Sequence, residues 1–515
     1  MANYLRPGVF IEESLRPLTA SLSAPGDAFA AFVGTHPKGP TLPTLITSWS
    51  QFLARYGSFS SIPTEYLAHA VYQFFNNGGR NAYIVRAANA NAVVSSVTLM
   101  DVAGTPAALL TVTAKYVGVA GNSFFVTVEK SDSDATGAAD TRFNLLIHEG
   151  SSAAASIVER YFDLSMDPAD SRYALPIVNS PEVGSTRVTL THAGAQTYAL
   201  LRARPAVQAG TVLTGGSDGT GTPALDTAAL TLESVTEKHN LVLSLPGVTG
   251  AATLNPVITW ASGLGSVFVV VDGPAFATST AATVTAYGAI PAALAKSSYA
   301  AVYGPWTLVN DPATSVNGSV RTLPPSGAVV GHYLATDARR GVQKPPAGVD
   351  NVLNSVLALD TKFLSADLDV LNQKGVNVIK NIPGIGFCIF GARTLSNNSS
   401  DRYISIRRVL MAVKRDLLEG TRFAVFEPNE ETLWDRLEGV ITDYLTTLQQ
   451  IGMLKGNVPS QGFFVKVDSE NNTTASIASG EVNIEVGLAL LSPAEFVVIK
   501  IGQYSSGGSA ATEIA

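Results

Sequence analysis

The sequence contains a single cysteine, Cys388, among its 515 residues. One cysteine excludes a disulfide framework and any metal site built from several cysteines. The six histidines are scattered, and no two have the i, i+4 spacing of a helical metal site; they are His36, His69, His148, His192, His239 and His332. Cys388 lies in an apolar run, where an inert buried thiol is expected. The sequence therefore predicts no metal and no cofactor.

Charge is also scarce. Charged residues make up 15% of the chain, against about 25% in typical soluble proteins. The net charge of −7 argues against a dedicated nucleic-acid binder, which carries a basic surface. The chain has no run of 18 apolar residues and no basic-then-apolar leader, so we expect neither a membrane span nor a signal peptide. A surface so poor in charge suggests that neighbouring copies cover much of it.

The first 25 residues are predicted to form an extended arm. Pro7-Gly8 makes a turn, the next residues favour a strand, and Pro17 and Pro25 prevent a helix. Such a strand has no partner nearby in sequence, so it pairs either with another subunit or at the edge of its own sheet.

Two stretches have α/β character, residues 26–88 and 224–350. Ser48 and Gln51 form the sequence signature of a capping box at the start of a helix. Residues 267–272 are continuously apolar up to Asp272, which is typical of a parallel strand buried on both faces. Asp272 then stands where α/β folds place catalytic groups, although capping a helix or turn is the commoner use of such a residue.

Residues 89–223 alternate short β-prone runs with Gly, Asp, Ser and Pro, which predicts an inserted β-rich domain. Residues 215–221 (GGSDGTG) lack the Lys-Ser/Thr of a phosphate-binding loop and are interpreted as a linker.

The last third contains the clearest helices. Apolar residues recur at helical spacing between Ile406 and Leu417, and four basic residues lie on or beside the opposite face: Arg407, Arg408, Lys414 and Arg415. This face is either solvated or a docking surface for an acidic partner. A second helix follows Glu430 and Glu431, and strands are expected over residues 462–467, 481–486 and 495–501.

Catalysis is not supported by the residues. The G-x-S-x-G spacing occurs only within residues 215–221, which are interpreted as a linker and not as a nucleophile elbow, and His332 is more typical of a packed structural histidine than of a general base. A hydrolase would need a triad that the scattered histidines do not offer.

An ordered series of motifs runs along the chain. The series begins with residues 7–13 (PGVFIEE) and 74–80 (FFNNGGR) and continues with residues 325–331 (PSGAVVG), 335–341 (ATDARRG) and 344–347 (KPPA). It ends with residues 371–377 (LNQKGVN), 391–395 (GARTL), 403–408 (YISIRR), 426–429 (FEPN) and 493–498 (PAEFVV). In this order and spacing, and most strongly in the last third, the motifs resemble the tail sheath proteins of contractile phages and phage-derived injection systems.

The resemblance implies a multidomain α/β and α+β fold. An inner core from both chain ends would carry a subtilisin-like, non-catalytic α/β middle portion and an inserted β-rich outer domain. The implied divisions are an arm (residues 1–25), a first core α/β segment (26–88), the outer domain (89–223), the subtilisin-like domain (224–350), the C-terminal sheath core (351–494) and a strand arm with tail (495–515).

The resemblance also implies the function and the partners. Hexameric rings would stack helically around an inner tail tube and contract from a metastable extended state, with baseplate and tail terminator or cap proteins as further partners and no nucleic acid or membrane insertion. Assembly would take place in the bacterial cytoplasm, for a virion tail or an injection particle. Another self-assembling shell protein is the alternative.

The same resemblance implies which residues link the subunits. Strands in the two arms would add to a neighbour's C-terminal domain; they are Val9, Phe10, Ile11 and Glu12, and Phe496, Val497, Val498, Ile499, Lys500 and Ile501. The basic residues Arg407, Arg408, Lys414 and Arg415 are the candidates for contact with an acidic tube surface.

Overall fold

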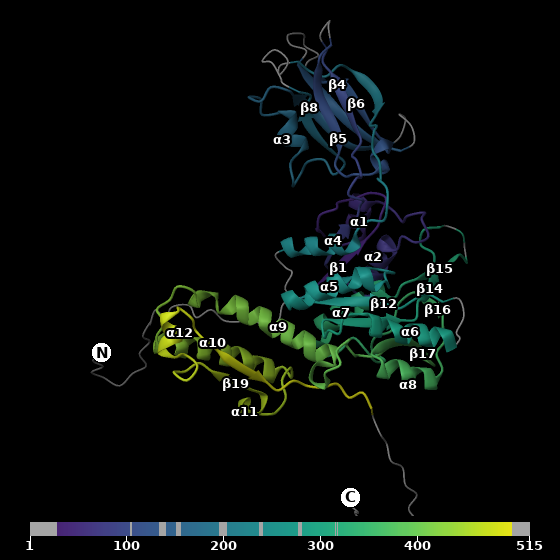
Figure 1. Ribbon diagram of the computed structural model, residues 1–515. Helices are drawn as coiled ribbons and strands as arrows, with labels where there is room; N and C mark the ends of the chain where they lie inside the picture. The colour runs from purple at the N-terminus through teal and green to yellow at the C-terminus, as the bar shows by residue number, and fades with distance from the viewer. Residues whose placement is uncertain are drawn as a thin grey trace, which may run out of the picture.

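The computed structural model describes residues 28–496 apart from 103–105, 133–140, 151–155, 195–202, 236–239, 277–280, 315 and 317. Figure 1 shows a central layer of strands flanked by helices, a β-rich unit at one end, and a long helical pair projecting to one side. This mixed α/β and α+β organisation confirms the predicted fold class; the subtilisin-like topology stays a prediction.

The central element is an eight-stranded sheet with the order β18-β17-β13-β12-β11-β1-β3-β2. Its strands are β1 (Phe29–Gly34), β2 (Thr44–Ile46), β3 (Ala82–Arg86), β11 (Leu241–Ser244), β12 (Val267–Asp272), β13 (Ala300–Gly304), β17 (Val376–Ile382) and β18 (Gly386–Phe390). The six inner strands are parallel, and both edge strands are antiparallel. Every residue of β12 is buried, as its apolar sequence predicts.

Helices cover both faces of this sheet and give it two hydrophobic cores. One face carries α1 (Trp49–Tyr56), α2 (Leu67–Asn76) and α7 (Ser326–Arg340), and the other carries α4 (Leu225–Leu230), α5 (Ala251–Leu264), α6 (Ala281–Ala293) and α8 (Ser365–Gln373). The sheet joins strands on both sides of residue 350, so the expected boundary between residues 224–350 and 351–494 falls within one sheet.

The capping signature at Ser48 starts α1 as predicted. The Ser48 hydroxyl accepts a hydrogen bond from the Gln51 amide at 3.3 Å. The Gln51 side chain accepts from the Thr47 amide at 2.9 Å, one residue earlier than in a standard capping box. Gly57, with φ of 86°, follows the last helical residue.

The β-rich unit contains two antiparallel sheets around a core of its own. Its elements are β4 (Ser96–Met100), β5 (Ala108–Ala114), β6 (Phe124–Lys130), β7 (Arg142–Glu149), β8 (Ser156–Ser165), α3 (Ala174–Val178), β9 (Val188–His192) and β10 (Gln208–Val212). Arg86 fastens this unit to the central sheet, because its guanidinium donates to the carbonyls of Pro37 and Val117 at 3.0 and 2.6 Å. Residues 215–221 run beside residues 91–93 as a connection.

The remaining elements belong to a three-stranded sheet, in the order β15-β14-β16, and to the C-terminal region. They are β14 (Thr307–Asn310), β15 (Val320–Leu323), β16 (Val356–Leu359), α9 (Ile404–Gly420), α10 (Glu431–Gln450), α11 (Pro459–Gly462), β19 (Phe463–Lys466), α12 (Thr474–Ala478) and β20 (Glu485–Leu488). Short 3-10 turns are η1 (Val119–Ser123), η4 (Thr231–Ser234), η6 (Ser399–Asp401) and η7 (Arg422–Ala424).

The strand expected over residues 481–486 begins later than predicted. Asn472 binds the backbone of Asn483 on both sides, accepting from its amide at 2.6 Å and donating to its carbonyl at 3.1 Å. These bonds hold the preceding residues in a loop, and β20 begins at Glu485.

Candidate assembly site

The C-terminal region is built on the antiparallel helices α9 and α10 (Figure 1). The apolar stripes predicted for both helices meet in one core with Val413, Ile441 and Leu448 buried. Within this core the Tyr444 hydroxyl donates to the Asp416 carboxylate at 2.5 Å. The two helices therefore share one hydrophobic core, and the strands that follow them pack against it.

A two-stranded antiparallel sheet, β19 and β20, packs against α9 and α10. Its inner face contributes Phe463, Val465 and Val486 to the helical core. On its outer face Phe464 is 53% exposed and lies over Gly487, where an added Cβ would come within 2.0 Å of the phenyl ring.

In the described portion of the chain, β19 and β20 have no other partner strand, so each has one open edge. Open edges present unpaired backbone N–H and C=O groups, which pair readily with a strand from another chain.

The predicted arm strands fall largely outside the described residues. This applies to Val9, Phe10, Ile11 and Glu12, and to Val497, Val498, Ile499, Lys500 and Ile501. Phe496 is described; it is 73% exposed and has no strand pairing among the residues that the structure describes.

The four basic residues of α9 bind groups of their own chain, and the two that are buried, Arg408 and Arg415, do not belong to the predicted basic surface. Arg408 is buried and forms an ion pair with Asp337 of α7. Arg415 is buried beside Asp416. Their positive charges are neutralised inside the subunit, so neither can lie on a tube-facing surface.

The other two basic residues also dock α9 onto the α/β region. Arg407 lies over the Tyr299 ring, 4.6 Å from its centroid, and pairs with Asp401 at 2.8 Å. The exposed Lys414 donates to the Leu264 carbonyl at 3.3 Å, at the end of α5, where the helix dipole favours a cation. Of the four, only Lys414 is exposed.

Asp272 caps a helix, which is the commoner of the two roles considered for it. Its buried carboxylate accepts from the Ser326 amide at 2.9 Å and the Ser326 hydroxyl at 2.7 Å, at the start of α7, and from the Gly247 amide at 2.9 Å. Burial raises the pKa of Asp272 to about 6, although these hydrogen bonds oppose the shift. The carboxylate is used for structure and orients no histidine among the described residues.

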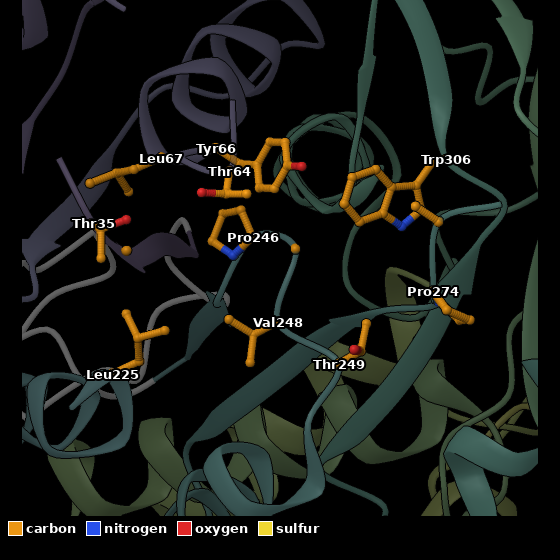
Figure 2. Close-up of a pocket in the computed structure, with 13 residues that line it drawn as sticks. Thr35, Thr64, Tyr66, Leu67, Leu225, Pro246, Val248, Thr249, Pro274 and Trp306 are labelled. Carbon is orange, nitrogen blue, oxygen red and sulfur yellow. The ribbon is translucent and has the colours of Figure 1, made fainter. Parts of the chain in front are cut away.

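A cavity of about 370 Å³ opens at the carboxyl ends of β1, β11 and β12 (Figure 2). Its lining includes Thr35, Tyr66, Pro246, Val248 and Trp306, and none of the described residues that line it is an aspartate, glutamate, histidine, lysine, arginine or cysteine. It therefore lacks the groups that acid–base or nucleophilic catalysis usually employs.

The described residues offer neither a metal cluster nor a membrane-spanning helix. No group of three or more of their His, Cys, Asp or Glu side chains is arranged to hold a metal ion. None of their helices combines the length and apolarity needed to cross a bilayer.

Comparison with known proteins identifies the class of this helix–strand unit. Residues 396–503 match the phage tail sheath C-terminal domain. A 168-residue stretch, 32% of this chain, is 28% identical to the tail sheath protein of Vibrio phage KVP40 and spans 24% of that relative, so the match covers about a quarter of the relative's length.

Solved structures extend the likeness to the whole fold. The sheath tail protein of Listeria innocua aligns over 92% of this chain and 97% of its own, with a TM-score of 0.60 and 14% identity. The anti-feeding prophage helical sheath in its contracted state aligns over 98% and 100%, with a TM-score of 0.55 and 22% identity. At these identities the structures establish the fold alone. The chain is thus similar to contractile tail sheath proteins in its C-terminal domain and in its fold, and these relatives are structural proteins.

Proposed function

We propose that this chain is the polymerising subunit of a contractile sheath, stacked as hexameric rings around an inner tube. The observation that carries the proposal is the β19–β20 sheet, which has two open edges among the described residues and lies in the stretch that matches the sheath C-terminal domain. A two-stranded sheet is marginal by itself and gains stability from added strands.

The added strands would come from neighbouring subunits. Residues 9–12 and 496–501 are short β-prone segments towards the two ends of the chain, and in a strand Val497, Ile499 and Ile501 would lie on one face. Main-chain hydrogen bonds would join the subunits, and burial of that face would strengthen the joint. Head-to-tail contacts of this kind continue as an open helix when they do not close into a ring.

Contraction would move each subunit nearly as a rigid body. The buried Arg408–Asp337 pair supports this view, because it fixes α9 to the α/β region inside one chain. Neighbours would stay tethered through their arms while the lattice becomes wider and shorter. The stored energy is conformational, in keeping with a structural protein whose described cavity carries no catalytic groups.

The inner tube, the baseplate and a terminator or cap protein are the proposed partners of the assembled sheath. Of the four basic residues considered for the tube contact, Lys414 is the one whose exposure supports that role. A charge reversal, Lys414→Glu, should weaken assembly on the tube and leave the isolated subunit folded.

Negative-stain electron microscopy of the purified chain at high concentration, with and without residues 1–20, tests the proposal. We expect striated hollow tubes from the full chain and folded, dispersed subunits from the truncated chain, alone or co-expressed with the tube protein. Tubes of unchanged length and yield after the truncation would contradict assembly through the N-terminal arm. Unfolding of the truncated chain would instead assign the strand to the subunit's own sheet.

A further inference from the structure

Glu495 lies just before the C-terminal arm, and side chains from several segments hold its carboxylate. Its carboxylate receives two bonds from Arg393, with Nε to Oε1 at 2.8 Å and Nη2 to Oε2 at 2.7 Å. Asn372 donates to Oε1 at 2.9 Å, and the Tyr403 hydroxyl donates to Oε2 at 3.0 Å. Both oxygens therefore have two donors each, and the bidentate arginine contact is among the strongest kinds of carboxylate recognition in proteins.

The donors come from three separate segments of the α/β region. Asn372 lies in α8, Arg393 follows β18, and Tyr403 immediately precedes α9. Asn377 of β17 holds Arg393 in place from behind, accepting from its amide at 2.7 Å and donating to its carbonyl at 2.8 Å. We call Glu495 and its three donors, Asn372, Arg393 and Tyr403, the Glu495 clamp.

The environment favours the ionised carboxylate. The Arg393 and Glu495 side chains are 12% and 18% exposed. Burial alone would raise the pKa of Glu495, but the hydrogen bonds from Arg393, Asn372 and Tyr403 outweigh it and hold the pKa below its ordinary value. The next residue, Phe496, is 73% exposed, so the chain changes from held to exposed within one residue.

Four of the sequence motifs each contribute one member of the Glu495 clamp: Asn372 from LNQKGVN, Arg393 from GARTL, Tyr403 from YISIRR and Glu495 from PAEFVV. Segments about 100 residues apart in the chain thus converge on one carboxylate.

We propose that the Glu495 clamp is the anchor of the C-terminal arm, fixing the point and direction in which residues 497–515 leave the α/β region so that they reach a neighbouring copy. This inference rests on the proposed exchange of arms between subunits. An arm that starts from a fixed point loses less conformational freedom on binding than one attached through a loose linker. Glu495 is thus a positioning residue, which acts on the interface without belonging to it.

The first test uses the isolated full-length subunit and hydrogen–deuterium exchange. Glu495→Gln removes the charge and keeps the shape, and we expect the hydrogen-bonded amides of Arg393, Thr394 and Leu395 to exchange about tenfold faster than in the wild type, the equivalent of about 1.4 kcal/mol. Tyr403→Phe, which removes one donor, should give a smaller increase. The control Glu438→Gln changes an exposed glutamate on α10 and should leave these amides unchanged. Unchanged exchange in Glu495→Gln would overturn the anchor.

The second test uses tube formation followed by electron microscopy. Removal of residues 497–515 should abolish tubes, and Glu495→Gln should reduce their yield severalfold while the subunit stays folded. If the truncated chain still forms tubes, the proposed arm exchange fails. If truncation abolishes tubes but Glu495→Gln assembles like the wild type, arm exchange stands and the anchor inference fails. Should Glu495→Gln not fold, Tyr403→Phe decides by the same two readouts.

Discussion

The guanidinium of Arg408 in α9 meets the carboxylate of Asp337 in α7 at two points inside the subunit, with Nη1 2.7 Å from Oδ1 and Nη2 bonded to Oδ2. The Arg408 side chain is 1% exposed, and its guanidinium lies over the ring of Tyr333, whose hydroxyl bonds that of Tyr303 at 2.7 Å. This buried ion pair therefore joins α9 to α7, one of the helices that cover the central sheet.

Removal of one member of this pair should be costly. Arg408→Ala leaves the Asp337 carboxylate buried without its main counter-charge, and such losses destabilise proteins by about 3–5 kcal/mol. Chemical denaturation measures the change. The control Arg340→Ala breaks an exposed 4.0 Å pair with Asp350 at the end of α7 and should cost about 0–1 kcal/mol. Equal losses in the two variants would contradict the structural role of Arg408.

Gly327 allows α7 to pack closely against α2. A Cβ at this position would lie 2.4 Å from the Ala70 carbonyl oxygen and 2.6 Å from its Cα, and backbone atoms cannot move aside cheaply. Gly327→Ala should therefore destabilise the subunit by about 1–3 kcal/mol or more. Gly439→Ala on α10, where a Cβ meets nothing within 4 Å, should be neutral or stabilising by up to about 1 kcal/mol. Thermal melting of both variants checks the difference, and a neutral Gly327→Ala would show that the helices can separate without cost.

Acid should weaken the fold through His332. Burial lowers the pKa of His332 to about 4, so the native state stays neutral while the unfolded chain takes up a proton below its ordinary value of 6.5. Stability should fall as the pH decreases from 6.5 to 4, by up to about 1.4 kcal/mol per pH unit. The stability of His332→Leu should therefore fall less steeply with decreasing pH than that of the wild type. Melting temperatures measured across that pH range test the claim, and identical slopes in variant and wild type would refute it.

The sequence predicts the local elements better than it predicts the contacts between them. Apolar periodicity predicts β12, α9 and α10, because each buries a continuous face. The interpretation of Arg408 as part of a basic surface is wrong because its acceptor is distant in sequence: Asp337 lies 71 residues before Arg408. No local pattern shows such a pairing, and a charged residue on a helix is usually solvated.

The Glu495 clamp shows the same limit. Its members span residues 372–495, so spacing alone cannot bring them together. The available signal is the series of family-like motifs, four of which each supply one member. The arm strands themselves, residues 9–12 and 497–501, lie outside the described residues and stay predictions.

Disulfide trapping between two differently tagged populations tests the central claim most directly. One population carries Glu485→Cys in β20 of the β19–β20 sheet. The other carries Lys500→Cys or, in a second series, Phe10→Cys. The native Cys388 is buried, so the introduced thiols should react selectively. Paired strands bring Cα atoms about 4.5–5.5 Å apart, within disulfide range; Val498→Cys and Glu12→Cys cover a shift of register by two residues. We expect disulfides between the two populations in assembled tubes and none in dispersed subunits. Tubes that form without such links at any of these positions would contradict assembly by strand exchange.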